Sequence, residues 1–157
     1  MKISQALIAF CIGLFMTGFS YADNTYKSTT VFKTDFQNQD WNGVKITVGT
    51  LKGVNKTFGS SIANIPNGES VQNCLIRAAR KSDSFESISN CTVVDKDGDI
   101  YYTLAERKQG DISAGGKGQL KMIGSTGKYK GVTSTCEYTA KYLPENWLVV
   151  ESECVKD

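Results

Sequence analysis

Apolar and polar residues alternate along most of the chain in short runs, which recur roughly every 10–15 residues between glycine and Asn/Asp turns. Alternation with period two is typical of half-buried strands, and no segment keeps the spacing of an amphipathic helix over three turns. The predicted strands cover residues 30–37, 44–51, 56–65, 71–79, 85–94, 100–107, 118–123, 133–143 and 147–154. The first is equally consistent with an extended arm. Eight or nine strands with short connections predict an all-β fold, either an up-and-down barrel or a sandwich.

The last two predicted strands form the best-determined hairpin. A turn at residues 144–146 places Leu143 opposite Trp147 and Cys136 opposite Cys154. In this register one face of the hairpin carries Cys136, Tyr138, Ala140, Tyr142, Leu148, Val150 and Cys154. Because side chains alternate with period two, a slip of one residue would move this whole set to the other face.

The same construction works for a second hairpin and predicts two disulfides. A two-residue turn at residues 82–83 brings Cys74 opposite Cys91. Directly opposed residues have Cα atoms about 4.5–5.5 Å apart, which is within disulfide reach. We therefore predict Cys74–Cys91 and Cys136–Cys154. A zinc site made by all four cysteines is disfavoured, because their spacing contains no C-x-x-C pair.

Residues 1–22 have the pattern of an export signal. Lys2 is their only charged residue, an apolar run follows over residues 6–19, and small residues stand at the −3 and −1 positions of a cleavage site after Ala22. The apolar run is too short for a comfortable membrane span, so no integral membrane segment is expected after cleavage. The remaining residues 23–157 are predicted to form a single β-barrel domain. Its predicted location is periplasmic or extracellular, where disulfides persist.

Charge and histidine content narrow the chemistry. Cleavage leaves 17 basic and 16 acidic residues, which gives no strong electrostatic argument for binding nucleic acid. Lys121, Lys128 and Lys130 are interpreted as a solvated face. The chain contains no histidine. Ser-His-Asp catalysis, Cys-His catalysis and histidine-bound metals are therefore excluded, and no cofactor and no metal are predicted.

Residues 95–99, Asp-Lys-Asp-Gly-Asp, resemble the start of an EF-hand calcium loop, in which Glu106 would stand at position 12. The residues between them are predicted to form a strand, which would carry Glu106 far from the turn. Asp-Gly between two alternating runs is a hairpin signal. A turn is therefore favoured over a calcium site.

Four side chains are predicted to face the inside of the barrel as a candidate ligand cavity: Tyr138, Tyr142, Leu148 and Val150. The interior of an eight-stranded barrel is about wide enough for its own side chains. Two alternatives therefore stay open: these residues fill the core, or they line a pocket for an apolar ligand.

The remaining polar residues that could take part in catalysis or binding are Glu106, Arg107, Arg77 and Arg80. They are interpreted as parts of a solvated outer face, which is the usual place for charged side chains.

Two segments resemble known proteins. Residues 91–99, CTVVDKDGD, resemble the C-T-x-x-D-x-D-G-D hairpin of small secreted bacterial proteins of uncharacterised role. Residues 116–131, GKGQLKMIGSTGKYKG, are similar to the G-K-G-x-W-x-x-x-G-G-T-G-K-Y-x-G-I segment of the same proteins and to the G-G-T-G-x-F-x-G corner of allene oxide cyclase and dirigent proteins. Leu120, Ser125 and Ser134 depart from these patterns.

The resemblance implies the fold that allene oxide cyclase and dirigent proteins share, an eight-stranded antiparallel barrel with an apolar cavity. It also implies a structural corner formed by Gly124, Thr126, Gly127, Tyr129 and Gly131, in which glycine permits positive φ and close strand crossing. None of these positions is catalytic in the plant enzymes, so cyclase or coupling activity is not carried over.

These observations predict an exported, disulfide-stapled barrel without catalysis, which binds a small apolar ligand or a protein partner and no nucleic acid. One alternative is an isomerase or cyclase that uses the barrel cavity, with a tyrosine or carboxylate as its polar group. Another alternative is a structural or adhesive surface protein.

Overall fold

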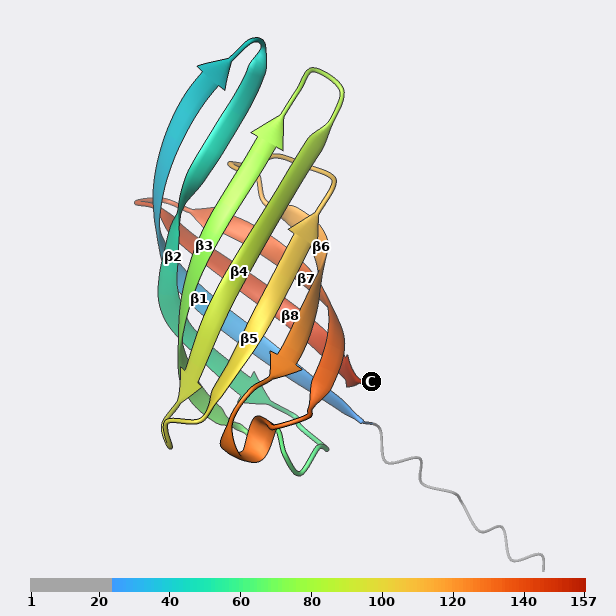
Figure 1. Ribbon diagram of the computed structural model, residues 1–157. Helices are drawn as coiled ribbons and strands as arrows, with labels where there is room; N and C mark the ends of the chain where they lie inside the picture. The colour runs from blue at the N-terminus through green and yellow to red at the C-terminus, as the bar shows by residue number, and fades with distance from the viewer. Residues whose placement is uncertain (1–23) are drawn as a thin grey trace, which may run out of the picture.

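The protein is a closed barrel of eight antiparallel strands in a computed structural model that describes residues 24–157 (Figure 1). The strands are β1 (Thr25–Trp41), β2 (Val44–Phe58), β3 (Gly68–Arg80), β4 (Phe85–Asp95), β5 (Ile100–Arg107), β6 (Gly116–Gly124), β7 (Thr133–Leu143) and β8 (Trp147–Lys156). Each strand pairs with the next in sequence, and β8 pairs with β1 to close the ring. The predicted fold class is therefore confirmed. The predicted export signal, residues 1–22, and the cleavage site lie outside the described residues.

The largest departure from the predicted strands lies in β2, and β1 is longer than the predicted residues 30–37. Residues 44–51 and 56–65 were expected to be two strands, whereas β2 is continuous through Gly53 and ends at Phe58. A Cβ atom at position 53 would lie 2.1 Å from the Val31 carbonyl oxygen on β1. Glycine therefore serves the close approach of two strands here and does not mark a turn. The predicted first strand is a full member of the barrel, since β1 pairs on both sides.

Both predicted disulfides are present and both point into the barrel. Cys74 faces Cys91 across β3 and β4, and Cys136 faces Cys154 across β7 and β8, each pair with its Cα atoms 4.0 Å apart. The turns have the predicted lengths: the Lys81 amide donates to the Ser84 carbonyl at 2.9 Å. All four cysteines are buried.

The core consists of two apolar clusters inside the barrel. The first cluster closes the end at which the chain enters β1, and its buried members are Tyr26, Ile62, Ile65, Met122, Tyr129, Val132, Cys136 and Cys154. The second cluster lies further along the barrel, and its buried members are Phe32, Leu51, Cys74, Cys91, Tyr138, Ala140 and Leu148. One disulfide belongs entirely to each cluster, so the two crosslinks fasten different parts of the core.

The outer wall carries a row of apolar side chains that crosses six strands. Directly paired positions place Val149, Val31, Val54, Val71, Val94 and Ile100 side by side on β8, β1, β2, β3, β4 and β5. Val31, Val54 and Val71 are 41%, 51% and 53% exposed. An exposed apolar row of this length is a candidate surface for a protein partner. Within the described residues, no helix is long and apolar enough to cross a membrane.

Candidate functional site

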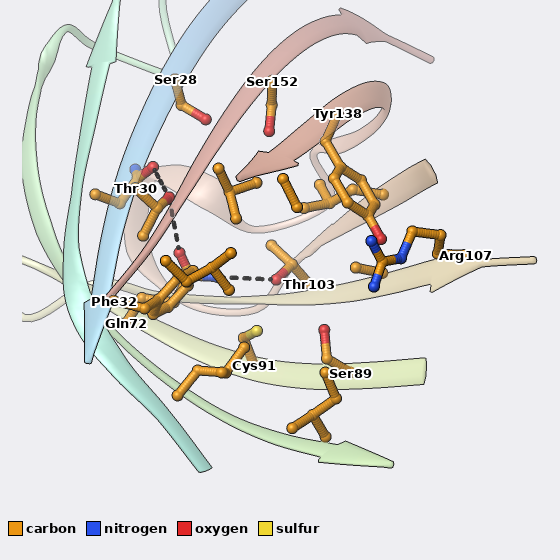
Figure 2. Close-up of a pocket in the computed structure, with 18 of the residues that line it drawn as sticks. Ser28, Thr30, Phe32, Gln72, Ser89, Cys91, Thr103, Arg107, Tyr138 and Ser152 are labelled. Atoms are coloured by element: carbon orange, nitrogen blue, oxygen red, sulfur yellow. Dashed lines mark hydrogen bonds between the residues drawn. The ribbon is translucent and has the colours of Figure 1, made fainter. Parts of the chain in front are cut away.

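The barrel interior holds a cavity of about 70 Å³ to which all eight strands contribute side chains (Figure 2). The four side chains predicted to face it, Tyr138, Tyr142, Leu148 and Val150, all line this cavity. Its volume is small beside the roughly 300–1,000 Å³ of pockets for drug-sized ligands. The side chains therefore fill most of the interior and leave room for a molecule of a few non-hydrogen atoms.

One wall of the cavity is polar, which the sequence did not predict. Thr30 Oγ1 donates to Asn55 Oδ1 at 2.8 Å, and Gln72 Nε2 donates to Thr103 Oγ1 at 3.3 Å. These side chains come from β1, β2, β3 and β5, and all are buried. In the sequence these residues are visible only as single polar side chains at inward-facing positions of separate strands. They form a hydrogen-bond network only when the strands pair.

Among Glu106, Arg107, Arg77 and Arg80, Arg107 is the residue whose predicted placement was wrong. It was interpreted as part of a solvated outer face, whereas it is only 4% exposed and lines the cavity. The reason is the register between β4 and β5, which pairs Arg107 with the inward-facing Ser87. Figure 2 shows its guanidinium pointing into the pocket beside the hydroxyl of Tyr138.

The other three polar residues lie on or near the outer surface, as expected. Glu106 points outward from β5. Arg77 is exposed and lies 3.7 Å from a Glu86 carboxylate oxygen. Arg80 is partly exposed and contacts the connection between β5 and β6.

The contacts of Arg107 leave its charge uncompensated. Its Nη2 donates to the Asp111 carbonyl oxygen at 3.0 Å, and its guanidinium lies 4.9 Å from the centre of the Phe85 ring. Its Nη1 is buried and has no hydrogen-bond partner. The nearby Asp111 carboxylate is engaged elsewhere, by Arg80 Nη1 at 3.0 Å and by the backbone amide and hydroxyl of Ser113. A cation is therefore held inside the barrel without a matching anion from residues 24–157.

The two tyrosines near this cation are hydrogen-bond donors at neutral pH. Burial raises the pKa of Tyr138, and it raises the pKa of Tyr142 to about 12, while the positive charge of Arg107 opposes both shifts. The Tyr138 ring lies over Gly118 of the paired strand, where a Cβ atom would stand 2.6 Å from two ring carbons. The absence of a side chain at position 118 thus leaves the space that the Tyr138 ring occupies.

The five predicted corner residues lie at the end of the barrel away from Arg107. A Cβ atom on Gly124 would meet the Tyr129 carbonyl oxygen at 1.7 Å, and Gly127 and Gly131 have φ of 52° and 75°. Thr126 Oγ1 accepts a hydrogen bond from the Ile100 amide at 2.7 Å, and the Tyr129 ring is buried. These contacts are structural and join the β6–β7 connection to β5.

The turn at residues 95–99 is built around a lysine. Lys128 Nζ contacts Asp95, lies 2.7 Å from Asp97 Oδ2 and lies 3.6 Å from Asp99 Oδ2. The interpretation of Lys128 as part of a solvated face was therefore wrong. Among the residues that the structure describes, no group of three or more acidic or cysteine side chains is arranged to hold a metal ion. An ammonium group occupies the space between these carboxylates.

The ion cluster lowers the pKa of Asp95. Burial acts to raise this pKa, but hydrogen bonds from Lys128, from the backbone amides of Asp97 and Asp99 and from the Tyr129 hydroxyl together outweigh it. A carboxylate whose folded pKa is lowered stabilises the fold above its unfolded pKa and loses that contribution as the pH falls through the folded value.

Replacing Lys128 with methionine is expected to make the free energy of unfolding less sensitive to pH in the acid range. The wild type should lose stability as the pH falls below about 4, where aspartates of the unfolded chain begin to protonate while Asp95 in the folded protein still resists protonation, and the variant should lose less over that range. Urea unfolding at a series of pH values from neutral to about 2 measures the difference. Lys121→Met, which removes an exposed lysine, is the control. An equal offset between wild type and Lys128→Met at every pH would contradict the assignment.

Comparison with known proteins assigns no family and no function to this site. No family model matches the chain, and neither a curated protein nor a solved structure matches it. The resemblance to allene oxide cyclase and dirigent proteins stays a prediction.

Proposed function

We propose that the protein is an exported binding protein that holds a small, largely apolar molecule inside its barrel and does not transform it. The observation that carries the proposal is the interior cavity, in which Tyr138, Tyr142, Leu148 and Val150 converge from two paired strands. Two disulfides and a closed sheet give this cavity a rigid wall, and rigidity reduces the ordering cost of binding.

The ionisable groups at the cavity favour binding over proton transfer. A general base works best with a pKa near the operating pH. The pKa values of Tyr138 and Tyr142 are raised instead, so both hydroxyls keep their protons and act as donors. An isomerase or cyclase that uses a tyrosine or carboxylate is therefore the less favoured alternative. The two disulfides support a periplasmic or extracellular location.

Titration with a small apolar probe tests the proposal. For the very best small ligands the binding free energy reaches about 1.5 kcal/mol per non-hydrogen atom, so a probe of about five such atoms binds with a Kd no tighter than about micromolar. We expect millimolar n-butanol to shift the amide NMR signals of cavity-lining residues saturably. Native mass spectrometry of protein from its natural source should then reveal the molecule that it carries.

A cavity-filling variant provides the control. Ala140 lines the cavity, so Ala140→Phe should remove the n-butanol response, whereas Ala114→Phe on an exposed connection should leave it unchanged. A response that survives in Ala140→Phe would place the probe outside the barrel. The absence of any saturable shift in the wild type would overturn the proposal.

Binding of a protein partner is the second candidate, and the apolar row on the outer wall favours it. Val31, Val54 and Val71 expose about half of their surface in directly paired positions. Contiguous exposed apolar patches on a protein surface often mark sites of protein–protein interaction. This candidate gains weight if the cavity binds neither n-butanol nor a molecule from the natural source.

A further inference from the structure

The interior of the barrel contains an electrostatic imbalance that packing alone does not account for. Arg107 is almost fully buried, and one of its two terminal nitrogens has no hydrogen-bond partner. Leaving a buried charge unpaired is strongly unfavourable, and buried charges in proteins are normally paired or hydrogen-bonded throughout. In residues 24–157 Arg107 forms no ion pair, whereas Arg80 of β3 pairs with the Asp111 carboxylate in the β5–β6 connection.

Residues that do not line the cavity hold the guanidinium in place. Asp111 accepts from Nη2 through its backbone carbonyl, and the Phe85 ring packs against the cation. Position 116 is a glycine whose Cβ, if present, would lie 3.1 Å from Nη1. The β5–β6 connection is in turn fastened to β3, because Arg80 Nη1 donates to the Gly110 carbonyl at 2.7 Å. The guanidinium is thus fixed by neutral groups and meets no opposite charge among residues 24–157.

The cavity side of Arg107 offers hydroxyl groups. Tyr138 stands beside the guanidinium, and Figure 2 also shows the hydroxyl of Ser89 directed into the same space. Tyr142 lines this part of the cavity as well. A cation with neighbouring hydroxyl donors is the arrangement that recognises an oxygen anion, and guanidinium matches the two oxygens of a carboxylate through parallel hydrogen bonds.

We infer that Arg107 is the anchor for a carboxylate, and that the ligand of the barrel is a short-chain organic acid whose apolar end points toward Leu148 and Val150. This inference rests on the proposed function and specifies the chemical class of its ligand. The small volume of about 70 Å³ restricts the chain to a few carbons. Leu148 and Val150, on β8, supply the apolar wall that such a chain needs.

Propionate and propionamide test the inference, because they have the same number of non-hydrogen atoms and differ in charge. NMR titration of the wild type should show propionate binding about tenfold more tightly or better, since hydrogen bonds to a charged group are worth more than neutral ones. Arg107→Met should remove this preference. Arg77→Met, which removes an arginine from the outer wall, should keep it.

A second measurement on the wild type covers the case in which Arg107→Met does not fold. Propionate should shift the guanidinium NMR signals of Arg107 and leave those of Arg77 in place. Equal affinity for propionate and propionamide would overturn the carboxylate anchor while n-butanol binding keeps the proposed function. Inorganic phosphate that displaces propionate with equal affinity would also overturn the carboxylate anchor, because the site would then bind any small anion and would not select a carboxylate. Failure of n-butanol, propionate and propionamide together would overturn both.

Discussion

Gly124→Ala is expected to destabilise the barrel by about 3 kcal/mol or more. A Cβ atom at position 124 would lie 1.7 Å from the Tyr129 carbonyl oxygen and 2.8 Å from the Val132 carbonyl oxygen. Both are backbone atoms of the connection that follows, so the clash cannot be relieved by rotating a side chain. The Gly124 amide also donates to the Val132 carbonyl at 2.7 Å, and moving the connection away would break this bond. Urea unfolding followed by circular dichroism measures the loss.

Gly68→Ala is the matched control for this prediction. Gly68 begins β3, and no atom lies within 4 Å of the position that its Cβ would take. Alanine there should be neutral or should stabilise by about 0.4–1 kcal/mol, because it restricts the unfolded chain. Equal stability of Gly124→Ala and Gly68→Ala would show that the corner adjusts without strain, and would contradict its role as a fixed junction between β6 and the β6–β7 connection.

Removing either disulfide is expected to cost about 2–5 kcal/mol in the free energy of unfolding. The crosslinks join residues 17 and 18 positions apart, so each restricts the unfolded chain to nearly the same extent. Cys74→Ala/Cys91→Ala and Cys136→Ala/Cys154→Ala should therefore lose similar amounts. The two bonds lie in separate core clusters and share no atoms, so the losses should add in the variant that lacks both.

Two measurements check the disulfide prediction. Mass spectrometry of a non-reduced digest should show the two predicted links, and a link between Cys91 and Cys136 would contradict the register of the barrel. Urea unfolding of the two double variants should then give the losses. A loss below about 1 kcal/mol for either pair would mean that the hairpin is already ordered in the unfolded state.

The fold could be predicted from the sequence because each strand shows as a local alternation of apolar and polar residues. One face of β7 carries the alternate residues Cys136, Tyr138, Ala140 and Tyr142, and only one register buries that face. The same register places Cys136 opposite Cys154. The continuous β2 was missed because Gly53 interrupts the alternation where two strands approach closely. The four apolar and aromatic cavity residues were found by the same parity argument.

The polar part of the candidate site was not accessible to local reasoning. Arg107 follows Glu106 at the end of a strand, and charged residues at strand ends are usually solvated. Its inward direction depends on pairing with Ser87, and its burial depends on Phe85 and on the connection that ends at Gly115. Lys128 was misjudged for a related reason, because the aspartates that surround it lie about thirty residues earlier in the chain.

The sequence by itself determined every strand except the continuous β2, the two disulfide pairs and the inward face of β7 and β8, because a period of two and directly opposed cysteines are properties of neighbouring residues and single hairpins. Only the tertiary structure decided that the sheet closes, that the interior keeps about 70 Å³ and that Arg107 enters it without an ion-pair partner from residues 24–157. Closure and burial depend on how strands distant in the chain pair and pack, and the free energy of a buried charge is set by those neighbours rather than by its own segment.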